Sequence, residues 1–296
     1  MMPADFRELD RAELRSFTSV DGPSMPIGML MWWVLISLAA ALLSTWIAAV
    51  YVDRRPLHAL GLRIGGRWWA DFGFGLVLGV ALITGLVALQ IGLGWMEITA
   101  RGGSDANAPR LLREIVNASI VFLSVGIYEE VVIRGYQMTN LAEGLNFRRW
   151  NAPTALMAAL LLSSVVFSLL HAVNPGYSAL ALVNLALISI LALGLSYALT
   201  GRLGLSIGLH TSWNFTLAFI FGLPVSGVRL GEHAALPTTV TGPELWTGGG
   251  FGPEGGGLGT VAILAACAAL LLWTRWREGD VAIREHIAEP PGSEPA

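Results

Sequence analysis

Long apolar runs alternate with short polar segments along the whole chain. Stretches without Asp, Glu, Arg or Lys cover residues 26–52, 72–96, 150–201 and 255–274. A helix that crosses a bilayer needs about 20 apolar residues, so the 150–201 stretch is long enough for two spans. We therefore expect an all-α polytopic membrane bundle of about seven spans, near Pro26–Val52, Trp69–Ile91, Leu112–Leu141, Ala152–His171, Leu180–Thr200, Leu203–Phe221 and Leu258–Trp273.

Composition supports one membrane-embedded domain. The chain is 54% apolar and 13% charged, whereas a soluble domain has about 25% charged residues. We expect the membrane domain to cover residues 25–274, between a polar segment at 1–24 and a polar tail at 275–296. Segment 1–24 has an amphipathic pattern, so it either lies on the membrane surface or forms a solvated helix. Its net negative charge is not typical of a secretory signal.

Charge and cysteine content exclude several classes of function. The net charge is −3 and the basic residues form no cluster suited to nucleic acid, so we expect no nucleic-acid partner. The single cysteine, Cys267, cannot form an internal disulfide or a Cys-based metal site. With seven spans, ten arginines lie on the membrane side that holds the 53–68 linker and seven on the opposite side. Because the side richer in arginine is usually the inside, this count favours an N-terminus on the outside. The Gly- and Pro-rich segment 222–257 is expected to be flexible.

Three ionisable residues interrupt the third apolar span. Glu129, Glu130 and Arg134 follow a charge-free helical stretch from 115 to 128. Such groups are costly at membrane depth unless they are paired or line a wet cavity. Glu130 and Arg134 are four residues apart on a helix and should form an ion pair. Glu129 points about 100° away on the same helix and stays available for chemistry.

Two histidines are the other ionisable residues within expected spans. Phe167 lies one helical turn before His171, and Asn214 lies one turn after His210. The imidazole of His210 and the amide of Asn214 should therefore share one helix face. Polar faces on several spans of a bundle converge on a buried pocket, so we expect these groups to meet.

The three ordered patterns resemble the motifs of a known family. Glu129-Glu130-x-x-x-Arg134, Phe167-x-x-x-His171 and His210-x-x-x-Asn214 are similar to those of the CPBP family, the CAAX-prenyl-protease and bacteriocin-processing (ABI) group. The resemblance covers residues 126–214. It implies a multi-helical intramembrane endopeptidase whose partners are the lipid bilayer and a membrane-associated protein or peptide substrate. We expect a bacterial or archaeal cell membrane as its location.

Two chemistries are open for such a site. Amide hydrolysis needs an activated water and a group that stabilises the oxyanion. In one version Glu129 is the base with His171 as its partner, while His210 and Asn214 hold the oxyanion. Glu130 and Arg134 then shape the field around Glu129, and Phe167 positions His171. In the other version His171, His210 and Glu129 bind a catalytic zinc, although the usual His-Glu-x-x-His zinc signature is absent.

Non-enzymatic functions are open as well. The Glu130–Arg134 pair and the Asn214 amide could serve helix packing alone. If the protein is a membrane scaffold or a bacteriocin-immunity protein, cells should keep the phenotype that it confers when Glu129 is mutated. A transporter would use Glu129 and Glu130 as a proton or cation site. The chain lacks an obvious internal repeat, which argues against a repeat-built transporter.

Overall fold

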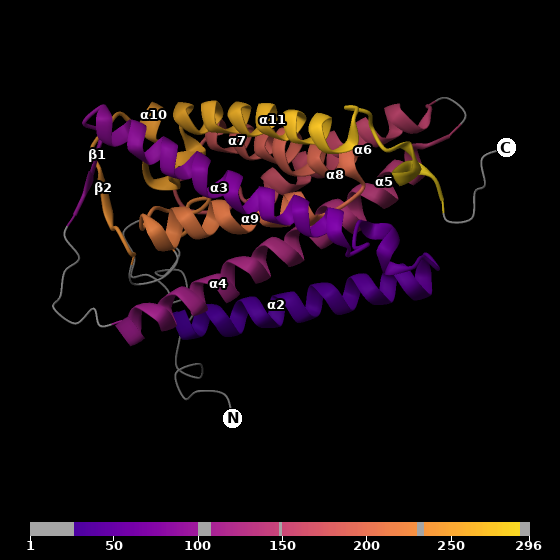
Figure 1. The fold of residues 1–296 in the computed structure, drawn as a ribbon, viewed down its shortest axis with the longest axis horizontal. Helices are drawn as coiled ribbons and strands as arrows, with labels where there is room; N and C mark the ends of the chain where they lie inside the picture. Colours follow the sequence, from indigo (N-terminus) through magenta and orange to yellow (C-terminus); the bar gives the residue numbers. More distant parts are fainter. Residues whose placement is uncertain (1–26, 100–107, 148–149, 230–233, 291–296) are drawn as a thin grey trace.

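The computed structural model describes residues 27–99, 108–147, 150–229 and 234–290 of the chain. Apolar helices cross the long dimension of the molecule in alternating directions (Figure 1). The α-helices are α2 (Ile27–Ile47), α3 (Gly66–Gly92), α4 (Ala108–Glu130), α5 (Thr139–Leu145), α6 (Ala152–Leu170), α7 (Ala179–Ile188), α8 (Leu195–Thr200), α9 (Gly204–Phe215), α10 (Glu244–Thr247) and α11 (Gly257–Glu278). The expectation of a helical bundle is confirmed.

Several helices continue through wider π-helical or tighter 3₁₀ segments. The π-helical segments are η2 (Ala48–Val52), η4 (Val131–Met138), η5 (Ser189–Gly194) and η6 (Thr216–Ile220). The 3₁₀ segments are η3 (Leu57–Leu60), η7 (Gly249–Phe251), η8 (Pro253–Gly255) and η9 (Glu285–Ala288). Strands β1 (Met96–Ile98) and β2 (Thr238–Val240) form a small antiparallel sheet in which Met96 faces Val240. This sheet lies at one end of the bundle and adds to an otherwise helical fold (Figure 1).

Six helices among the described residues are long and apolar enough to cross a membrane. They are Met29–Val52, Gly66–Gly92, Leu111–Leu145, Ala152–Leu170, Ala179–Thr200 and Gly257–Glu278. The seventh expected span corresponds to α9 and η6, which contribute 12 and 5 helical residues. Every residue of α9 up to Asn214 is buried, so other helices enclose it and it has little contact with lipid. The protein is an integral membrane protein.

Glycines let α9 pack directly on α3. A Cβ on Gly75 would lie 2.5 Å from the carbonyl oxygen of Leu205, and one on Gly79 would lie 2.1 Å from Ser212 Oγ. From the other side, a Cβ on Gly208 would lie 2.2 Å from the carbonyl oxygen of Phe72. Small residues of this kind permit close backbone approach in membrane bundles. Gly75 and Gly79 thus form the contact by which α9 packs on α3.

The segment after α9 is folded, which corrects the expectation of a flexible loop at 222–257. From residue 234 onward it forms β2, α10, η7 and η8, and it buries Phe251 and Glu254. The Glu254 carboxylate accepts hydrogen bonds from Trp213 Nε1 at 3.0 Å and from the Ser226 backbone N–H at 2.5 Å. Its backbone carbonyl accepts one from Asn184 Nδ2 at 2.9 Å. These bonds fix a glycine-rich segment that composition alone marks as mobile.

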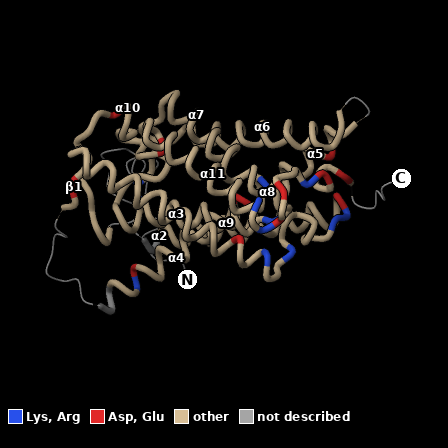
Figure 2. The backbone as a smooth tube through the Cα atoms, turned by 45° about the horizontal axis from the view of Figure 1, so that its top comes forward, with Lys and Arg blue, Asp and Glu red and all other residues tan. Residues whose placement is uncertain are grey.

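The two ends of the chain differ in how much of them the structure describes. The polar segment 1–24 and the last tail residues, 291–296, lie outside the described residues. Helix α11 continues to Glu278, beyond the expected boundary at 275. After it, Ile287 and Ala288 of η9 are buried, and the Ala288 carbonyl accepts a hydrogen bond from Asn146 Nδ2 at 2.9 Å. This part of the tail therefore packs on the bundle. Figure 2 shows that the charged residues gather mainly at this end of the molecule.

Candidate active site

The two adjacent glutamates stand at a change of helix type. Glu129 and Glu130 are the last residues of α4, and the π-helical η4 that follows carries Arg134. Segments of π-helix inside α-helices occur frequently at functional sites because they displace side chains from the regular α-helical register. The long helix Leu111–Leu145 thus carries the acidic pair in its interior, away from both of its ends.

Glu130 is the buried centre of the polar cluster. Its Oε1 atom accepts a hydrogen bond from Arg134 Nη1 at 2.8 Å, as the four-residue spacing predicts. The same oxygen lies 2.8 Å from His210 Nδ1. Arg134 also donates from Nη2 to Ser189 Oγ at 2.6 Å. Glu130 and Arg134 are both almost completely buried, so the pair stays stable only through these charge-assisted bonds.

Glu129 is partly exposed, whereas the neighbouring Glu130 is buried. The Oε1 atom of Glu129 accepts a hydrogen bond from the Tyr128 hydroxyl at 3.2 Å. Its Oε2 lies 3.7 Å from His210 Nε2, and its side chain keeps 20% of its surface exposed. Among the described residues, the structure gives Glu129 no hydrogen bond or ion pair with His171. The imidazole beside Glu129 is therefore that of His210, where the sequence suggested His171.

Phe167 connects the two histidines. His171 follows the last residue of α6, and its Nδ1 lies 2.8 Å from the carbonyl oxygen of Phe167. The Phe167 ring lies 4.7 Å from the ring of His171 and 6.3 Å from that of His210. The guanidinium of Arg134 lies 4.5 Å above the same ring, within the range of a cation–π contact. Phe167 thus packs against three polar members of the cluster.

One cavity of about 420 Å³ contains all four candidate catalytic side chains. Glu129, His171, His210 and Asn214 line it, together with apolar side chains from α2, α4 and α7. Ser226 and Glu254, from the folded segment after α9, line it as well. A mostly apolar pocket with a few converging polar groups is the usual form of a ligand site. Three motifs far apart in sequence therefore line one cavity.

A close contact between α4 and α9 brings these groups together. A Cβ on Gly126 would lie 2.5 Å from Thr211 Oγ1 and 3.3 Å from the carbonyl oxygen of Ile207. Gly126 is one helical turn before Glu130, and Thr211 follows His210. The absence of a side chain at Gly126 therefore lets the helix that carries the carboxylates approach the helix that carries the imidazole.

The described residues do not form a ready metal site. They contain no group of three or more His, Cys, Asp or Glu side chains placed to hold a metal ion. His171 uses Nδ1 on a backbone carbonyl, and His210 uses Nδ1 on Glu130. Metal-binding histidines make such Nδ1 contacts as well, so these contacts do not distinguish the two chemistries. The zinc set suggested by the sequence, His171, His210 and Glu129, is not among groups placed to hold a metal ion in this structure.

Several polar residues of the site region escaped the sequence analysis, and two of them, Ser189 and Glu254, hold other members of the site. Ser189 on η5 binds Arg134, and no motif marks it. Glu254 supports Trp213, the residue before Asn214, and closes one side of the cavity. The sequence feature that could have indicated Glu254 is its position as the acidic residue within the glycine-rich stretch 248–257. A lone carboxylate in such a stretch is consistent with a buried hydrogen-bond acceptor.

Comparison with known proteins identifies the segment that carries the site. Residues 111–216 match the family described as type II CAAX prenyl endopeptidase Rce1-like. The matched range contains the three motifs and the whole of α9. It confirms the resemblance to the CPBP and CAAX protease family. No curated protein and no solved structure matches the chain.

Proposed function

We propose that this protein is an intramembrane endopeptidase, because residues 111–216 match the CPBP and CAAX protease family. Its substrate would be a membrane-associated or lipid-modified protein or peptide in a bacterial or archaeal cell membrane. The observation that carries the proposal is the shared cavity of Glu129, His171, His210 and Asn214. Its apolar lining suits a substrate segment that approaches from the membrane.

The charges of the cluster suggest the protonation state of the site before the reaction. Glu129 and Glu130 contribute two negative charges, and Arg134 contributes one positive charge. A protonated His210 would balance them, with Nδ1–H donating to Glu130 and Nε2–H available beside Glu129. Buried charges are stable only when they are compensated and hydrogen-bonded. The proposed resting state is therefore a carboxylate at Glu129 and an imidazolium at His210.

The reaction follows from these positions. Glu129 accepts a proton from a water molecule, whose oxygen forms a bond to the scissile carbonyl carbon. The Asn214 amide and His210 Nε2–H donate to the resulting oxyanion. Glu129 then gives its proton to the amide nitrogen as the C–N bond breaks, which releases an amine and a carboxylic acid. His171, whose Nδ1–H donates to the Phe167 carbonyl, keeps Nε2 as an acceptor for the attacking water.

A reconstituted assay tests this proposal. The purified protein in liposomes would receive peptides that end in a farnesylated CAAX sequence, and the same peptides without the lipid. Glu129→Gln removes the base, and loss of a general base lowers the rate by about 10²–10⁴-fold. Glu97→Gln is the matched control because Glu97 is an exposed residue of β1, outside the cavity. Unchanged cleavage by Glu129→Gln would remove Glu129 from the mechanism.

A zinc-dependent version remains the alternative for the same residues. It would need His171, His210 and Glu129 to move together on a metal. The observation against it is that the described residues contain no group of three or more His, Cys, Asp or Glu side chains placed to hold a metal ion. The metal content of the purified protein distinguishes the two versions, as set out below.

A further inference from the structure

The segment after α9 supplies part of the wall of the catalytic cavity. Val225, Ser226, Val228 and Glu254 line this cavity together with the proposed catalytic side chains. None of the four lies within residues 111–216, the range that matches the endopeptidase family. This part of the wall is therefore a feature of the chain beyond the segment that the family match covers.

Residues 225–228 form a tight turn with an aliphatic face. Val225 and Val228 exchange two backbone hydrogen bonds of 2.9 Å. The central residues, Ser226 and Gly227, have φ values of 47° and 85°, and positive φ at both central positions is typical of a type I′ turn. Side chains of two residues paired across such a bridge lie on the same face. Because both valines line the cavity, this face belongs to its wall.

The buried carboxylate of Glu254 fixes this turn. Its Oε2 accepts hydrogen bonds from the backbone N–H of Ser226 at 2.5 Å and from Ser226 Oγ at 2.9 Å. Its Oε1 accepts one from Trp213 Nε1 at 3.0 Å. A non-glycine residue at positive φ is uncommon and costs energy, and these bonds stabilise Ser226 in that conformation. The side-chain donors of Ser226 and Trp213 are thereby used inside the wall, so neither is available to a substrate.

The turn also contacts the segment that follows His171. Asn174 Nδ2 donates to the carbonyl oxygen of Ser226 at 2.8 Å. A Cβ on Gly227 would lie 2.2 Å from the carbonyl oxygen of Pro175, so the turn packs directly on this backbone. The backbone N–H of Asn174 in turn donates to the carbonyl oxygen of His171 at 3.1 Å. The aliphatic face is therefore anchored beside a proposed catalytic residue.

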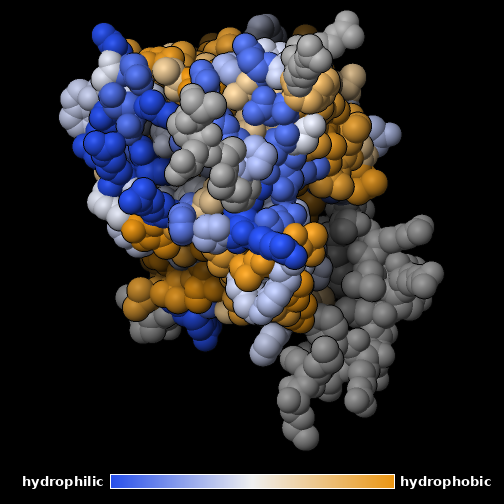
Figure 3. Space-filling view, turned by 90° about the vertical axis from the view of Figure 1, so that its right-hand side faces the viewer, coloured by the Kyte–Doolittle hydropathy of each residue, from blue (hydrophilic) through white to orange (hydrophobic). Residues whose placement is uncertain are grey.

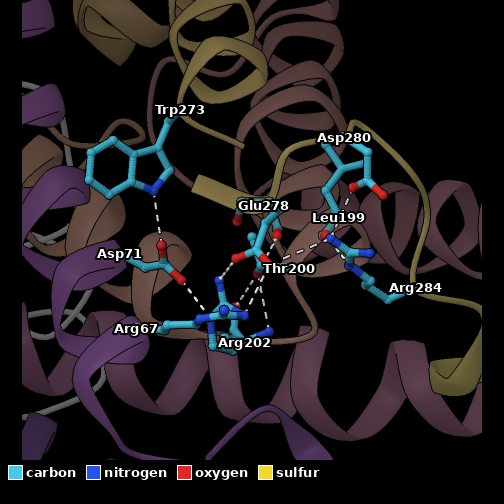
Figure 4. A network of polar contacts seen from close by, with 10 residues as sticks. Arg67, Asp71, Leu199, Thr200, Arg202, Trp273, Glu278, Asp280 and Arg284 are labelled. Atoms are coloured by element: carbon cyan, nitrogen blue, oxygen red, sulfur yellow. Dashed lines mark hydrogen bonds and ion pairs between the residues drawn. The ribbon is translucent and has the colours of Figure 1, made fainter. Parts of the chain in front are cut away.

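Helices α9 and α11, which carry this wall, are joined at both of their ends. Figure 3 views the bundle from the end where α11 finishes, and hydrophilic residues gather on that face. There Arg202, two residues before α9, binds Asp71 Oδ2 at 2.7 Å and Glu278 Oε1 of α11 at 2.6 Å (Figure 4). At the other end, Trp213 of α9 binds Glu254, three residues before α11. This double attachment gives the wall a fixed shape, which selection by size requires.

We propose that the turn 225–228 determines substrate specificity: its aliphatic face takes one apolar side chain of the peptide and limits the size of that side chain. This inference rests on the proposed peptidase function and adds the residues that select the substrate. A polar side chain would lose its water partners at this face and find no free donor on Ser226 or Trp213 in exchange. An apolar side chain buries its surface there without that cost.

Peptide selectivity of the full-length protein in liposomes tests this inference. In the farnesylated CAAX peptides, each residue after the cysteine would be replaced in turn by Ala, Val, Thr or Phe, and kcat/KM would be measured for each peptide. Val and Thr have nearly the same shape and differ in a hydroxyl, whereas Phe is larger. Val228→Thr adds a hydroxyl to the aliphatic face, and Val225→Ala enlarges the space beside it. Val240→Thr and Val240→Ala are the matched controls, because Val240 is an exposed residue of β2 outside the cavity.

We expect wild type to cleave the Val peptide about tenfold more efficiently than the Thr peptide at one position, as for a buried hydroxyl without a partner. Val228→Thr should reduce this ratio, and Val225→Ala should raise cleavage of the Phe peptide relative to the Val peptide about tenfold. A change that only loosened the fold would lower kcat/KM for all peptides and leave both ratios as they are in wild type. Unchanged ratios in both variants would overturn the proposal. Val228→Thr, at a partly exposed side chain, keeps the test decisive if thermal unfolding shows that Val225→Ala is not folded.

Peptide binding separates this inference from the proposed function. Fluorescently labelled Val and Thr peptides would be titrated against Glu129→Gln and against Glu129→Gln combined with Val228→Thr, with Kd measured by anisotropy. A binding preference for Val that Val228→Thr reduces, without cleavage by wild type, would support the role of the turn and contradict the peptidase function. Cleavage by wild type with the same ratios in every variant would contradict the role of the turn alone. Neither cleavage nor a binding preference would contradict both.

Discussion

His210 Nδ1 lies 2.8 Å from Glu130 Oε1, so a fully buried carboxylate fixes the imidazole from the adjacent helix. This bond turns the other ring nitrogen toward Glu129, 3.7 Å away. Arg134 neutralises the same oxygen of Glu130. Glu130 thus joins α4, η4 and α9, and it assigns separate tasks to two neighbouring carboxylates: one holds the histidine and the other faces the cavity.

Breaking the Glu130 cluster should destabilise the protein, and a double substitution should separate stability from activity. Glu130→Leu leaves Arg134 buried without its carboxylate, which typically costs about 3–5 kcal/mol. Combining it with Arg134→Met removes both charges and should restore most of the melting temperature in detergent. Activity should stay low in the double variant, because His210 has still lost the partner that orients it.

Recovery of activity along with stability would contradict that assignment, because it would make the whole cluster structural. No recovery of melting temperature in the double variant would show that the cost of the Glu130 substitution does not come from the unpaired arginine.

Substitution at Gly126 should lower activity, as substitution of the proposed catalytic residues should. Gly126→Val places a side chain against Thr211 Oγ1, and overpacking of this kind costs about 1–3 kcal/mol. It should also push α4 away from α9 and lower kcat. Gly85→Val is the matched control, since a Cβ on Gly85 of α3 meets nothing within 4 Å. Equal activity of the two variants would show that the close approach of α4 to α9 is not needed to position the residues of the site.

Glu254 should control substrate binding more than the chemical step. Glu254→Ala leaves Trp213 Nε1 and the donors of Ser226 unpaired, at about 1–3 kcal/mol for each buried group. We expect the cavity wall to loosen and KM to rise more than kcat falls. Glu244→Ala, at an exposed residue of α10 in the same segment, should change neither. A fall in kcat alone would instead place Glu254 in the chemistry.

Elemental analysis addresses the zinc alternative. The metal-free mechanism predicts less than one zinc per protein molecule and activity that survives chelators. One zinc per molecule that is lost in His171→Ala would contradict the metal-free mechanism. His286→Ala, outside the cavity, is the control for adventitious binding.

The parts of the site that are local in sequence were predictable, and those that depend on packing were not. The Glu130–Arg134 pair follows from helical spacing, and the charge-free runs mark the spans. The partner of Glu129 does not follow, because it depends on how closely α4 and α9 approach at Gly126. The segment after α9 looked flexible because glycine composition cannot show that Asn184, Trp213 and Ser226 converge on Glu254.

The central claim is that this protein cuts other proteins with Glu129. The most direct measurement compares protein termini by mass spectrometry in cells that make wild type and in cells that make Glu129→Ala at equal membrane level. We predict new N- and C-termini of membrane-associated proteins that occur with wild type alone. The account would be contradicted if the protein termini were identical in the two kinds of cells while both forms of the protein were inserted in the membrane. If the Glu129→Ala cells also kept the phenotype of wild-type cells, a scaffold or immunity function would be favoured.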